Sequence, residues 1–346
     1  MSRKERAVVV FPGRGSYGAS ELGYLKRHHA PRAAYLAAID AAVSEAGGTP
    51  ASVLDADDAF APKRHLPGRN ASNLIYACAL ADFAAIDRDR FDIVAVCGNS
   101  LGWYLTLAAG GAVSLADGAR IVDGMGHRME TRGVGGQILY PLTNDDWRID
   151  PERVAMVDAA LEAANRAGRA FRSIDLGGTA VLAGDEAGIA ALMDALPQIA
   201  DRFPMKLPRH AAFHTPLLGA VSDEALAEFS IDLFSRPATP LIDGRGVIWS
   251  PDATDLAALH RYTFGHQIVE PYDFSASIRV ALKEFAPDRL ILTGPGGSMG
   301  PPVAQTLVRE NWDDIASRDD FVQRQEVQPY ILSMGRDDQR PLATAN

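Results

Sequence analysis

The stretch "FDIVAVCGNSLGWYLTLAAGG", from Phe91 to Gly111, decides the fold. It begins with an apolar run that is typical of a buried parallel strand. Ser100 then stands between Gly98 and Gly102, and the following residues have the apolar spacing of a helix that ends at a glycine pair. Strand, Gly-x-Ser-x-Gly and helix is the order of a nucleophile elbow, whose glycines let the turn close tightly and expose the serine hydroxyl. The stretch therefore predicts a nucleophilic serine above the edge of a sheet.

Similar strands lie near both ends of the chain. "RAVVVF" (Arg6 to Phe11) is punctuated by Pro12 and Gly13, and "DRLILTGPGG" (Asp288 to Gly297) stops at a glycine-rich turn. Strands that alternate with helices predict an α/β fold with a mostly parallel sheet. The polar stretch from about Gly335 onward is expected to fray.

The middle of the chain has a different order of elements. Between Gly135 and Pro208 the pattern is β-α-β-β-α-β, with one of the helices over Pro151 to Ala167. This order matches a ferredoxin-like unit. We therefore predict a discontinuous large α/β catalytic domain (residues 1–134 and 209–320), a small ferredoxin-like subdomain (135–208) and a C-terminal extension (321–346).

Composition excludes several classes of function. The chain has 346 residues and a formal net charge of −10, which argues against non-specific binding to nucleic acid. No segment approaches the ~20 apolar residues that span a bilayer, and the apolar run near the N-terminus is too short for a signal peptide. We therefore expect a soluble, cytoplasmic protein without membrane contact. Cys78 and Cys97 lie in apolar runs and are expected to be buried thiols, so nothing supports a disulfide scaffold or a zinc site.

A nucleophilic serine needs a base, and the chain has eight histidines. Three lie in basic, loop-like segments and are expected at the surface: His28, His29 and His65. Three sit among polar residues with no special setting: His127, His260 and His266. The remaining two, His210 and His214, fall in "PRHAAFHTPLL", directly after the inserted unit.

Five motifs in register carry a resemblance to a known family. They are "FPGRGS" (from Phe11), "GNSLGWY" (from Gly98), "LADGARIVDGMGHRM" (from Leu115), "AAFHTPLL" (from Ala211) and "GPGG" (from Gly294). Together they resemble the malonyl-CoA:acyl-carrier-protein transacylases and the acyltransferase domains of polyketide synthases, over roughly residues 6 to 310. The resemblance implies a hydrolase-like α/β domain with an inserted ferredoxin-like subdomain, as the pattern of elements also predicts.

The resemblance assigns roles by position. Ser100 corresponds to the acylated nucleophile and His214 to its general base, in a Ser–His dyad whose imidazole is oriented by a backbone carbonyl. The segment "EPYDF" looks like the source of that carbonyl, from Asp273. The oxyanion hole would come from the backbone N–H groups of Arg14 and Leu101, and such donors are typically worth ~3–4 kcal/mol each.

These roles imply an acyltransferase with a ping-pong mechanism. His214 takes the proton of Ser100, the serine attacks a coenzyme A thioester, and the acyl group passes to the phosphopantetheine thiol of an acyl carrier protein. The thioester and the carrier protein are the substrates, and the chemistry calls for no metal and no redox cofactor. Family precedent and the lack of an obvious apolar seam favour a monomer.

The sequence departs from the malonyl-specific pattern at the acyl pocket. Malonyl-specific members carry an arginine that pairs with the free carboxylate, and Met125 stands at that position, with Arg128 three residues later. Ala71 stands where the family has a supporting glutamine. A buried carboxylate without its partner loses ~3–5 kcal/mol, whereas methionine suits a neutral acyl chain. We therefore expect a preference for a neutral acyl group, unless Arg14 or a shifted Arg128 supplies the missing cation.

Further pocket positions refine this expectation. Phe213 precedes the base and should crowd an α-branched acyl group, which favours an unbranched one. Asn99 replaces the family's usual histidine before the serine, and Trp103 replaces a common acidic residue, where it could pack under the elbow.

Two other functions remain open on this scaffold. A hydrolase would send water to the acyl-serine and clear stalled acyl groups from carrier proteins, and a non-catalytic partner would only bind the carrier protein. The basic runs Leu25 to Arg32 and Pro62 to Arg69 are either solvated surface or a docking patch for coenzyme A phosphates or an acidic carrier protein.

Overall fold

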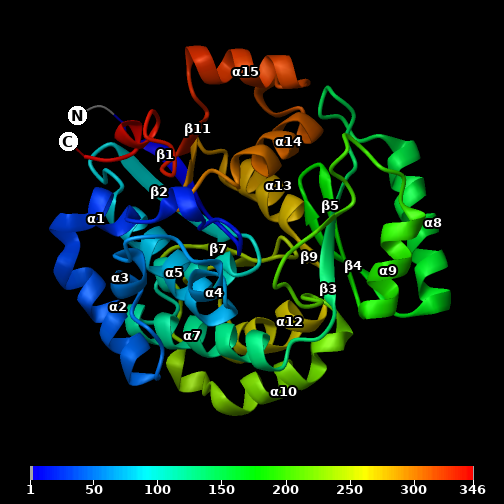
Figure 1. Cartoon of the computed structure of the whole chain (residues 1–346). Helices are drawn as coiled ribbons and strands as arrows, with labels where there is room; N and C mark the ends of the chain where they lie inside the picture. The colour runs from blue at the N-terminus through cyan, green and yellow to red at the C-terminus, as the bar shows by residue number, and fades with distance from the viewer. Residues whose placement is uncertain (1–2, 346) are drawn as a thin grey trace.

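A large sheet forms the centre of the computed structural model, which describes residues 3–345 (Figure 1). Its strands are β1 (Glu5–Phe11), β2 (Phe91–Gly98), β7 (Leu241–Ile242), β8 (Ile248–Trp249), β10 (Arg289–Leu292) and β11 (Ile331–Ser333). They lie in the order β11-β10-β1-β2-β7-β8, and every neighbouring pair is parallel except β7–β8. The apolar runs that predicted β1 and β2 form neighbouring parallel strands, because strands covered on both faces need continuous apolar sequence.

Helices pack around this sheet. They are α1 (Tyr24–His29), α2 (Ala33–Glu45), α3 (Ala51–Asp55), α4 (Pro62–His65), α5 (Gly68–Ala85), α6 (Gly102–Ala109), α7 (Leu115–Thr131), α10 (Gly219–Glu228), α11 (Leu256–Arg261), α12 (Gln267–Val269), α13 (Phe274–Phe285), α14 (Gly300–Glu310) and α15 (Arg318–Val327). A π-helical turn, η5 (Tyr262–His266), joins α11 to α12. Among the helices of residues 3–345, none combines the length and the apolarity that crossing a bilayer requires.

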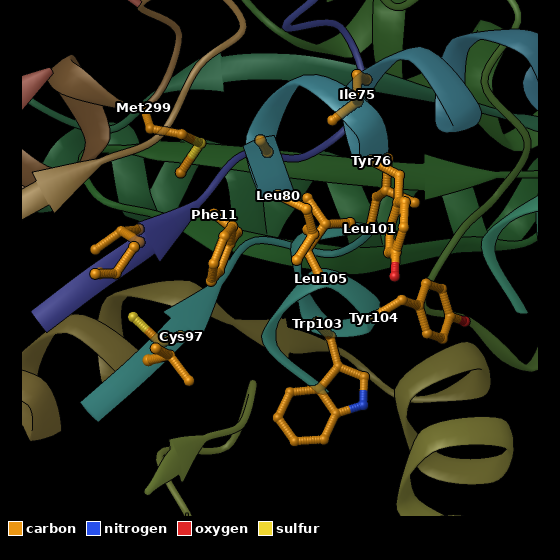
Figure 2. Packing of buried hydrophobic residues seen from close by; sticks show 14 of the residues in the cluster. Phe11, Ile75, Tyr76, Leu80, Cys97, Leu101, Trp103, Tyr104, Leu105 and Met299 are labelled. Atoms are coloured by element: carbon orange, nitrogen blue, oxygen red, sulfur yellow. The ribbon is translucent and has the colours of Figure 1, made fainter. Parts of the chain in front are cut away.

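The core lies between the central strands and the helix that follows the Ser100 turn. Figure 2 shows Phe11 from β1, Leu80 from α5 and Leu105 from α6 meeting in this core. Cys97 and Cys78 are buried free thiols, as predicted. Because these side chains are almost fully shielded from water, the end of β2 and the start of α6 have a rigid base.

The second sheet has the predicted ferredoxin-like strand order. It contains β3 (Gly136–Pro141), β4 (Ala170–Leu176), β5 (Thr179–Gly184) and β6 (Met205–Lys206), in the order β6-β3-β5-β4, all antiparallel. Helices α8 (Pro151–Ala167) and α9 (Glu186–Ala195) flank it on one side (Figure 1) and share a separate hydrophobic cluster with it. One more strand, β9 (Tyr272–Asp273), comes from outside residues 135–208 and pairs in parallel with β4.

The stretch from Gly335 onward is packed against the rest of the protein, so the expectation that it frays is wrong. Thr344 forms an antiparallel bridge with Ile86, and the side chain of Arg340 is buried. Its guanidinium donates to the carboxylate of Asp82 at 2.6 Å and to the hydroxyl of Tyr24 at 2.8 Å. These partners lie hundreds of residues away, so local polarity did not reveal the contact.

Candidate active site

The elbow places Ser100 in a strained turn at the end of β2. Its φ is +54°, a left-handed value that non-glycine residues adopt rarely and that is common at nucleophile elbows. The turn is tight: a Cβ at Gly98 would lie 2.5 Å from the carbonyl oxygen of Gly102. A Cβ at Gly102 would lie 2.6 Å from the carbonyl oxygen of Phe11. Both glycines are therefore required by close backbone approach, as the Gly-x-Ser-x-Gly pattern predicted.

His214 is the histidine that reaches the serine. Its Nε2 lies 2.8 Å from Oγ of Ser100, although the two residues are 114 positions apart. The side chain is buried, with 3% of its surface exposed, and burial lowers the pKa of His214 to about 4. The imidazole is therefore neutral near pH 7 and can accept the serine proton.

The carbonyl that orients His214 belongs to Gln267, so the assignment to Asp273 is wrong. Nδ1 of His214 lies 2.6 Å from the Gln267 carbonyl oxygen, which fixes the tautomer with the proton on Nδ1 and leaves Nε2 as the acceptor. Asp273 instead caps α13, where its carboxylate accepts from the N–H of Ala276 at 2.7 Å.

The Gln267 carbonyl is free to accept from His214 because the residue four positions later is Pro271. In a helix this carbonyl would accept from the N–H of residue 271, but residue 271 is proline and has no N–H. Helix α12 ends at Val269, and the Gln267 oxygen accepts from His214 instead. The segment "EPYDF" therefore marks the site through Pro271, which frees a carbonyl upstream.

The side chain of Gln267 also joins the elbow to its surroundings. Its Nε2 donates to the carbonyl of Ser100 at 3.2 Å, and its Oε1 accepts from the Tyr104 hydroxyl at 3.2 Å. Sequence reasoning missed Gln267, because neither contact follows from local pattern.

The backbone groups expected to form the oxyanion hole flank Ser100. Leu101 follows the serine directly, and Arg14 lies in the loop after β1; both line the same pocket as Ser100. Within residues 3–345, the N–H groups of Arg14 and Leu101 donate to no protein acceptor. Two unused donors beside the serine are what an oxyanion hole needs, and this role stays a prediction.

A small pocket of about 50 Å³ opens beside the dyad. Much of its wall is apolar and comes from α6, α7 and the residues around the dyad. Its lining residues are Arg14, Ser72, Ser100, Leu101, Tyr104, Met125, Gly126, Met129, Phe213, His214, Gln267 and Ile268. Met125 and Phe213 therefore lie in the pocket, where the sequence placed them.

Three other residues expected in the pocket do not line it. Ala71 is buried on α5, while its neighbour Ser72 faces the pocket and donates its hydroxyl to the Gly68 carbonyl at 2.6 Å. Asn99 is buried against the loop after β1, since a Cβ at Gly13 would lie 2.8 Å from its Nδ2.

Arg128 is the third, and it turns away from the pocket. Its guanidinium forms an ion pair with Glu228 of α10 and lies 5.2 Å from the centre of the Phe229 ring. Although Arg128 lies only three residues after Met125, its side chain points elsewhere, because Glu228, at the end of α10, offers it a carboxylate and Phe229, directly after α10, offers it an aromatic ring. Arg128 therefore does not supply a cation to the pocket.

The cation that does reach the pocket is Arg14. Its guanidinium lies 5.5 Å from the centre of the Phe213 ring and donates to the Arg209 carbonyl at 3.2 Å. Burial lowers the pKa of Arg14 to about 10, against the opposing charge of Glu130, so the side chain stays protonated at neutral pH.

Trp103 is buried, and so are two of the histidines expected at the surface. Trp103 is fully buried, and its indole N–H donates to Thr263 at 3.0 Å. Figure 2 shows its side chain projecting from α6, the helix that follows the elbow. His29 and His65, expected at the surface, are buried instead. His29 contacts Asp82 at 2.8 Å, and His65 lies against the carbonyl of Leu54 at 3.1 Å.

The geometry can be compared with that of known proteins. No family model matches the chain. Among curated proteins, it is 25% identical over 231 residues to the phenolphthiocerol synthesis polyketide synthase type I Pks15/1 of Mycobacterium marinum. That match covers 63% of this chain, and the chain spans only 10% of the length of that relative.

Solved structures match almost the whole chain. A malonyl-CoA:acyl carrier protein transacylase from Xanthomonas oryzae has a TM-score of 0.72, with 20% identity and 100% of each chain covered. A malonyl-transacylase solved in complex with its type II polyketide synthase acyl-carrier protein (PlMCAT:AntF) has a TM-score of 0.69 and 16% identity, covering 88% of this chain and 93% of that one. The fold is therefore that of the malonyl-CoA:acyl carrier protein transacylases, as the motifs predicted.

Proposed function

We propose that the protein is an acyltransferase that moves an acyl group from coenzyme A to the phosphopantetheine thiol of an acyl carrier protein. The observation that carries the proposal is the dyad: Oγ of Ser100 lies 2.8 Å from Nε2 of His214, whose Nδ1 is held by a backbone carbonyl. The dyad forms part of the wall of a largely apolar pocket. Solved structures with this fold include transacylases that act with acyl carrier protein, which supports the carrier protein as the acceptor.

The proposed reaction follows from the geometry of the dyad. Neutral His214 takes the Ser100 proton on Nε2 while Oγ attacks the thioester carbonyl, and the N–H groups of Arg14 and Leu101 bind the oxyanion. The tetrahedral intermediate collapses, the thiolate of coenzyme A leaves with the proton from His214, and an acyl-serine remains. The thiol of the carrier protein then attacks by the same steps in reverse order. The reaction would take place in the cytoplasm, which supplies both thioester and carrier protein, and the protein would work as a monomer.

The pocket supports a neutral, unbranched acyl group as the preferred substrate. Met125, Met129 and Ile268 present apolar surface to the space beside Ser100, and Phe213 narrows it next to the base. A carboxylate placed against this wall would lose the hydration of its charge, whereas a short alkyl chain would gain from burial.

Arg14 favours a second candidate substrate, an acyl group that carries a carboxylate, such as malonyl. Arg14 lines the same pocket as Ser100, and within the described residues its guanidinium makes one hydrogen bond, to the carbonyl of Arg209, so most of its N–H donors are uncommitted. Arginine can bind a carboxylate through two parallel hydrogen bonds. Arg14, rather than Arg128, would then be the relocated cation.

Incubation with acetyl-, butyryl-, malonyl- and methylmalonyl-CoA tests the proposal. Acyl-serine formation is followed by intact mass, and product is followed with and without a holo carrier protein. We expect acetyl or butyryl to load faster than malonyl, and methylmalonyl to load slowest. Faster loading of malonyl would select the Arg14 candidate. Free acid that forms faster than acyl-carrier protein would show a hydrolase instead, and no adduct with any thioester would refute acyl transfer.

A further inference from the structure

The backbone at His214 is as unusual as the backbone at Ser100. Its φ is +58°, a left-handed value that costs a non-glycine residue of order 1–3 kcal/mol. Directly before it, the N–H of Phe213 donates to the carbonyl of Ala211 at 2.8 Å, which forms a tight turn. A base held in such a turn needs neighbours that fix the orientation of the Phe213–His214 peptide.

A buried chain of side chains reaches that peptide from the inserted sheet. The hydroxyl of Ser173, on β4, lies 2.8 Å from the carbonyl oxygen of Phe213. The side-chain amide nitrogen of Gln137, on β3, lies 2.6 Å from the same hydroxyl. The other end of the Gln137 amide lies 2.8 Å from Nδ1 of His210. Ser173 is 0% exposed and Gln137 is 1% exposed.

The Phe213 carbonyl, at one end of this chain of hydrogen bonds, determines which group donates at each step. The Phe213 carbonyl can only accept, so the hydroxyl of Ser173 must donate to it. The oxygen of that hydroxyl then accepts from the Gln137 amide N–H, which leaves the Gln137 carbonyl oxygen to accept from the Nδ1–H of His210. Burial and the nearby charge of Arg14 lower the pKa of His210 to about 3, so the imidazole is neutral and has that single proton to give.

The strand geometry shows that Ser173 is placed for this contact. Between Arg172 and Ile174 the pairing of β4 with β5 skips one residue, so Ser173 is the extra residue of a β-bulge. A bulge removes one residue from the ladder and re-aims its side chain, often next to an active site. A regular strand would have kept Ser173 in register with β5.

We propose that Ser173 and Gln137 are positioning residues for catalysis: they hold the Phe213–His214 peptide so that the imidazole of His214 points at Ser100. The inference rests on the proposed role of His214 as the base. It gives the inserted subdomain a part in the chemistry, because β3 and β4 supply both side chains while Ser100 and Gln267 come from the large unit. Ser173 acts directly on the peptide and Gln137 acts through Ser173, so Ser173 carries the larger effect.

The test uses a fluorophosphonate probe, which phosphonylates an activated serine with loss of fluoride whatever the natural acyl donor. For wild-type protein, Ser173→Ala, Ser173→Thr and Gln137→Leu, the limiting rate of Ser100 labelling and the half-saturating probe concentration are measured by intact mass. Ser277→Ala is the matched control, since the buried Ser277 hydroxyl also donates to a backbone carbonyl, that of Asp243, at 2.7 Å.

We expect Ser173→Ala to lower the limiting rate about tenfold or more while the half-saturating concentration stays unchanged, because misplacement of a base affects the chemical step. Gln137→Leu should lose less, Ser173→Thr should recover most of the rate by keeping the hydroxyl, and Ser277→Ala should match wild type. Equal rates for Ser173→Ala and Ser277→Ala would overturn the inference.

The outcomes also separate this inference from the proposed function. Labelling of Ser100 by the probe without an adduct from any acyl thioester would refute acyl transfer, while the variants would still decide the positioning role. Wild-type labelling no faster than that of Ser100→Ala would refute both.

Discussion

Two buried histidines, His214 and His29, show how the partner of an imidazole decides what it does. His214 is 3% exposed, and its ring lies between the Ser100 hydroxyl and a backbone carbonyl. His29 is 0% exposed, and its Nε2 lies 2.8 Å from the carboxylate of Asp82. The same carboxylate accepts from Arg340 at 2.6 Å.

The difference separates a reactive site from a structural one. The Gln267 carbonyl fixes the His214 ring without adding a negative charge, so the imidazole stays neutral and its Nε2 is free to take a proton. At His29, the charges of Asp82 and Arg340 compensate each other away from water, and the cluster ties α1, α5 and the C-terminal segment together. The first site should therefore control rate, and the second should control stability.

The largest expected effect is on rate. His214→Ala should lower the rate of Ser100 acylation by about four orders of magnitude or more, because a serine without its base is a weak nucleophile. Single-turnover mass spectrometry measures the rate, and thermal unfolding should show little change. An acylation rate within about tenfold of wild type would break the comparison, since His214 would not be the base.

The next effect is on stability. Asp82→Asn should lower the free energy of unfolding by about 3–5 kcal/mol, because it leaves the buried Arg340 charge without its partner. Urea unfolding followed by circular dichroism measures the change. Acylation per folded molecule should stay near the wild-type value. A rate that falls while the unfolding free energy is unchanged would contradict the structural role of this cluster.

The pH dependence sharpens the contrast at His214. Burial lowers its pKa from the ordinary 6.5 to about 4, and only the neutral imidazole accepts the serine proton. The acylation rate should therefore stay level as pH falls from 7 through 6.5 and reach half its value at about pH 4. The unfolded chain regains the ordinary pKa and binds a proton that the folded protein does not, so stability should already fall as the pH drops from about 6.5 to about 4. A rate midpoint near 6.5 would show that the ring is not buried as described.

The smallest effect concerns acyl selectivity. Arg14→Met removes the cation of the pocket while keeping the backbone N–H that the oxyanion hole uses. If the neutral preference holds, the ratio of butyryl to malonyl loading should rise by about tenfold or less, because Arg14 is only half-buried and its charge is partly screened. Arg128→Met is the matched control outside the pocket and should leave the ratio unchanged. A shift with Arg128→Met instead would contradict the placement of both arginines.

The sequence predicts those features of the fold and the site that depend on neighbouring residues or on the order of elements. The elbow around Ser100 follows from its two glycines, and the ferredoxin-like unit follows from the order of strands and helices. His214 followed from the motif that it shares with a known family, and the structure places it against Ser100.

The remaining parts depend on contacts between distant segments. The motif points to Asp273, but the orienting carbonyl lies six positions earlier, at Gln267, because Pro271 has no N–H to donate to it. The local sequence predicts that His29 is exposed, but the side chain is buried because Arg340, 311 residues later, packs against it. Arg128 lies within one helical turn of Met125, but its side chain forms an ion pair with Glu228 on another helix and therefore does not enter the pocket.

The most direct measurement is the location of the acyl group after reaction with an acyl thioester. Wild-type protein is incubated with butyryl-CoA, digested at low pH and mapped by mass spectrometry, beside Ser100→Ala. The account predicts one butyryl group, carried by the peptide that contains Ser100, and no adduct on the variant. A butyryl group on any other residue, or equal acylation of Ser100→Ala, would contradict it.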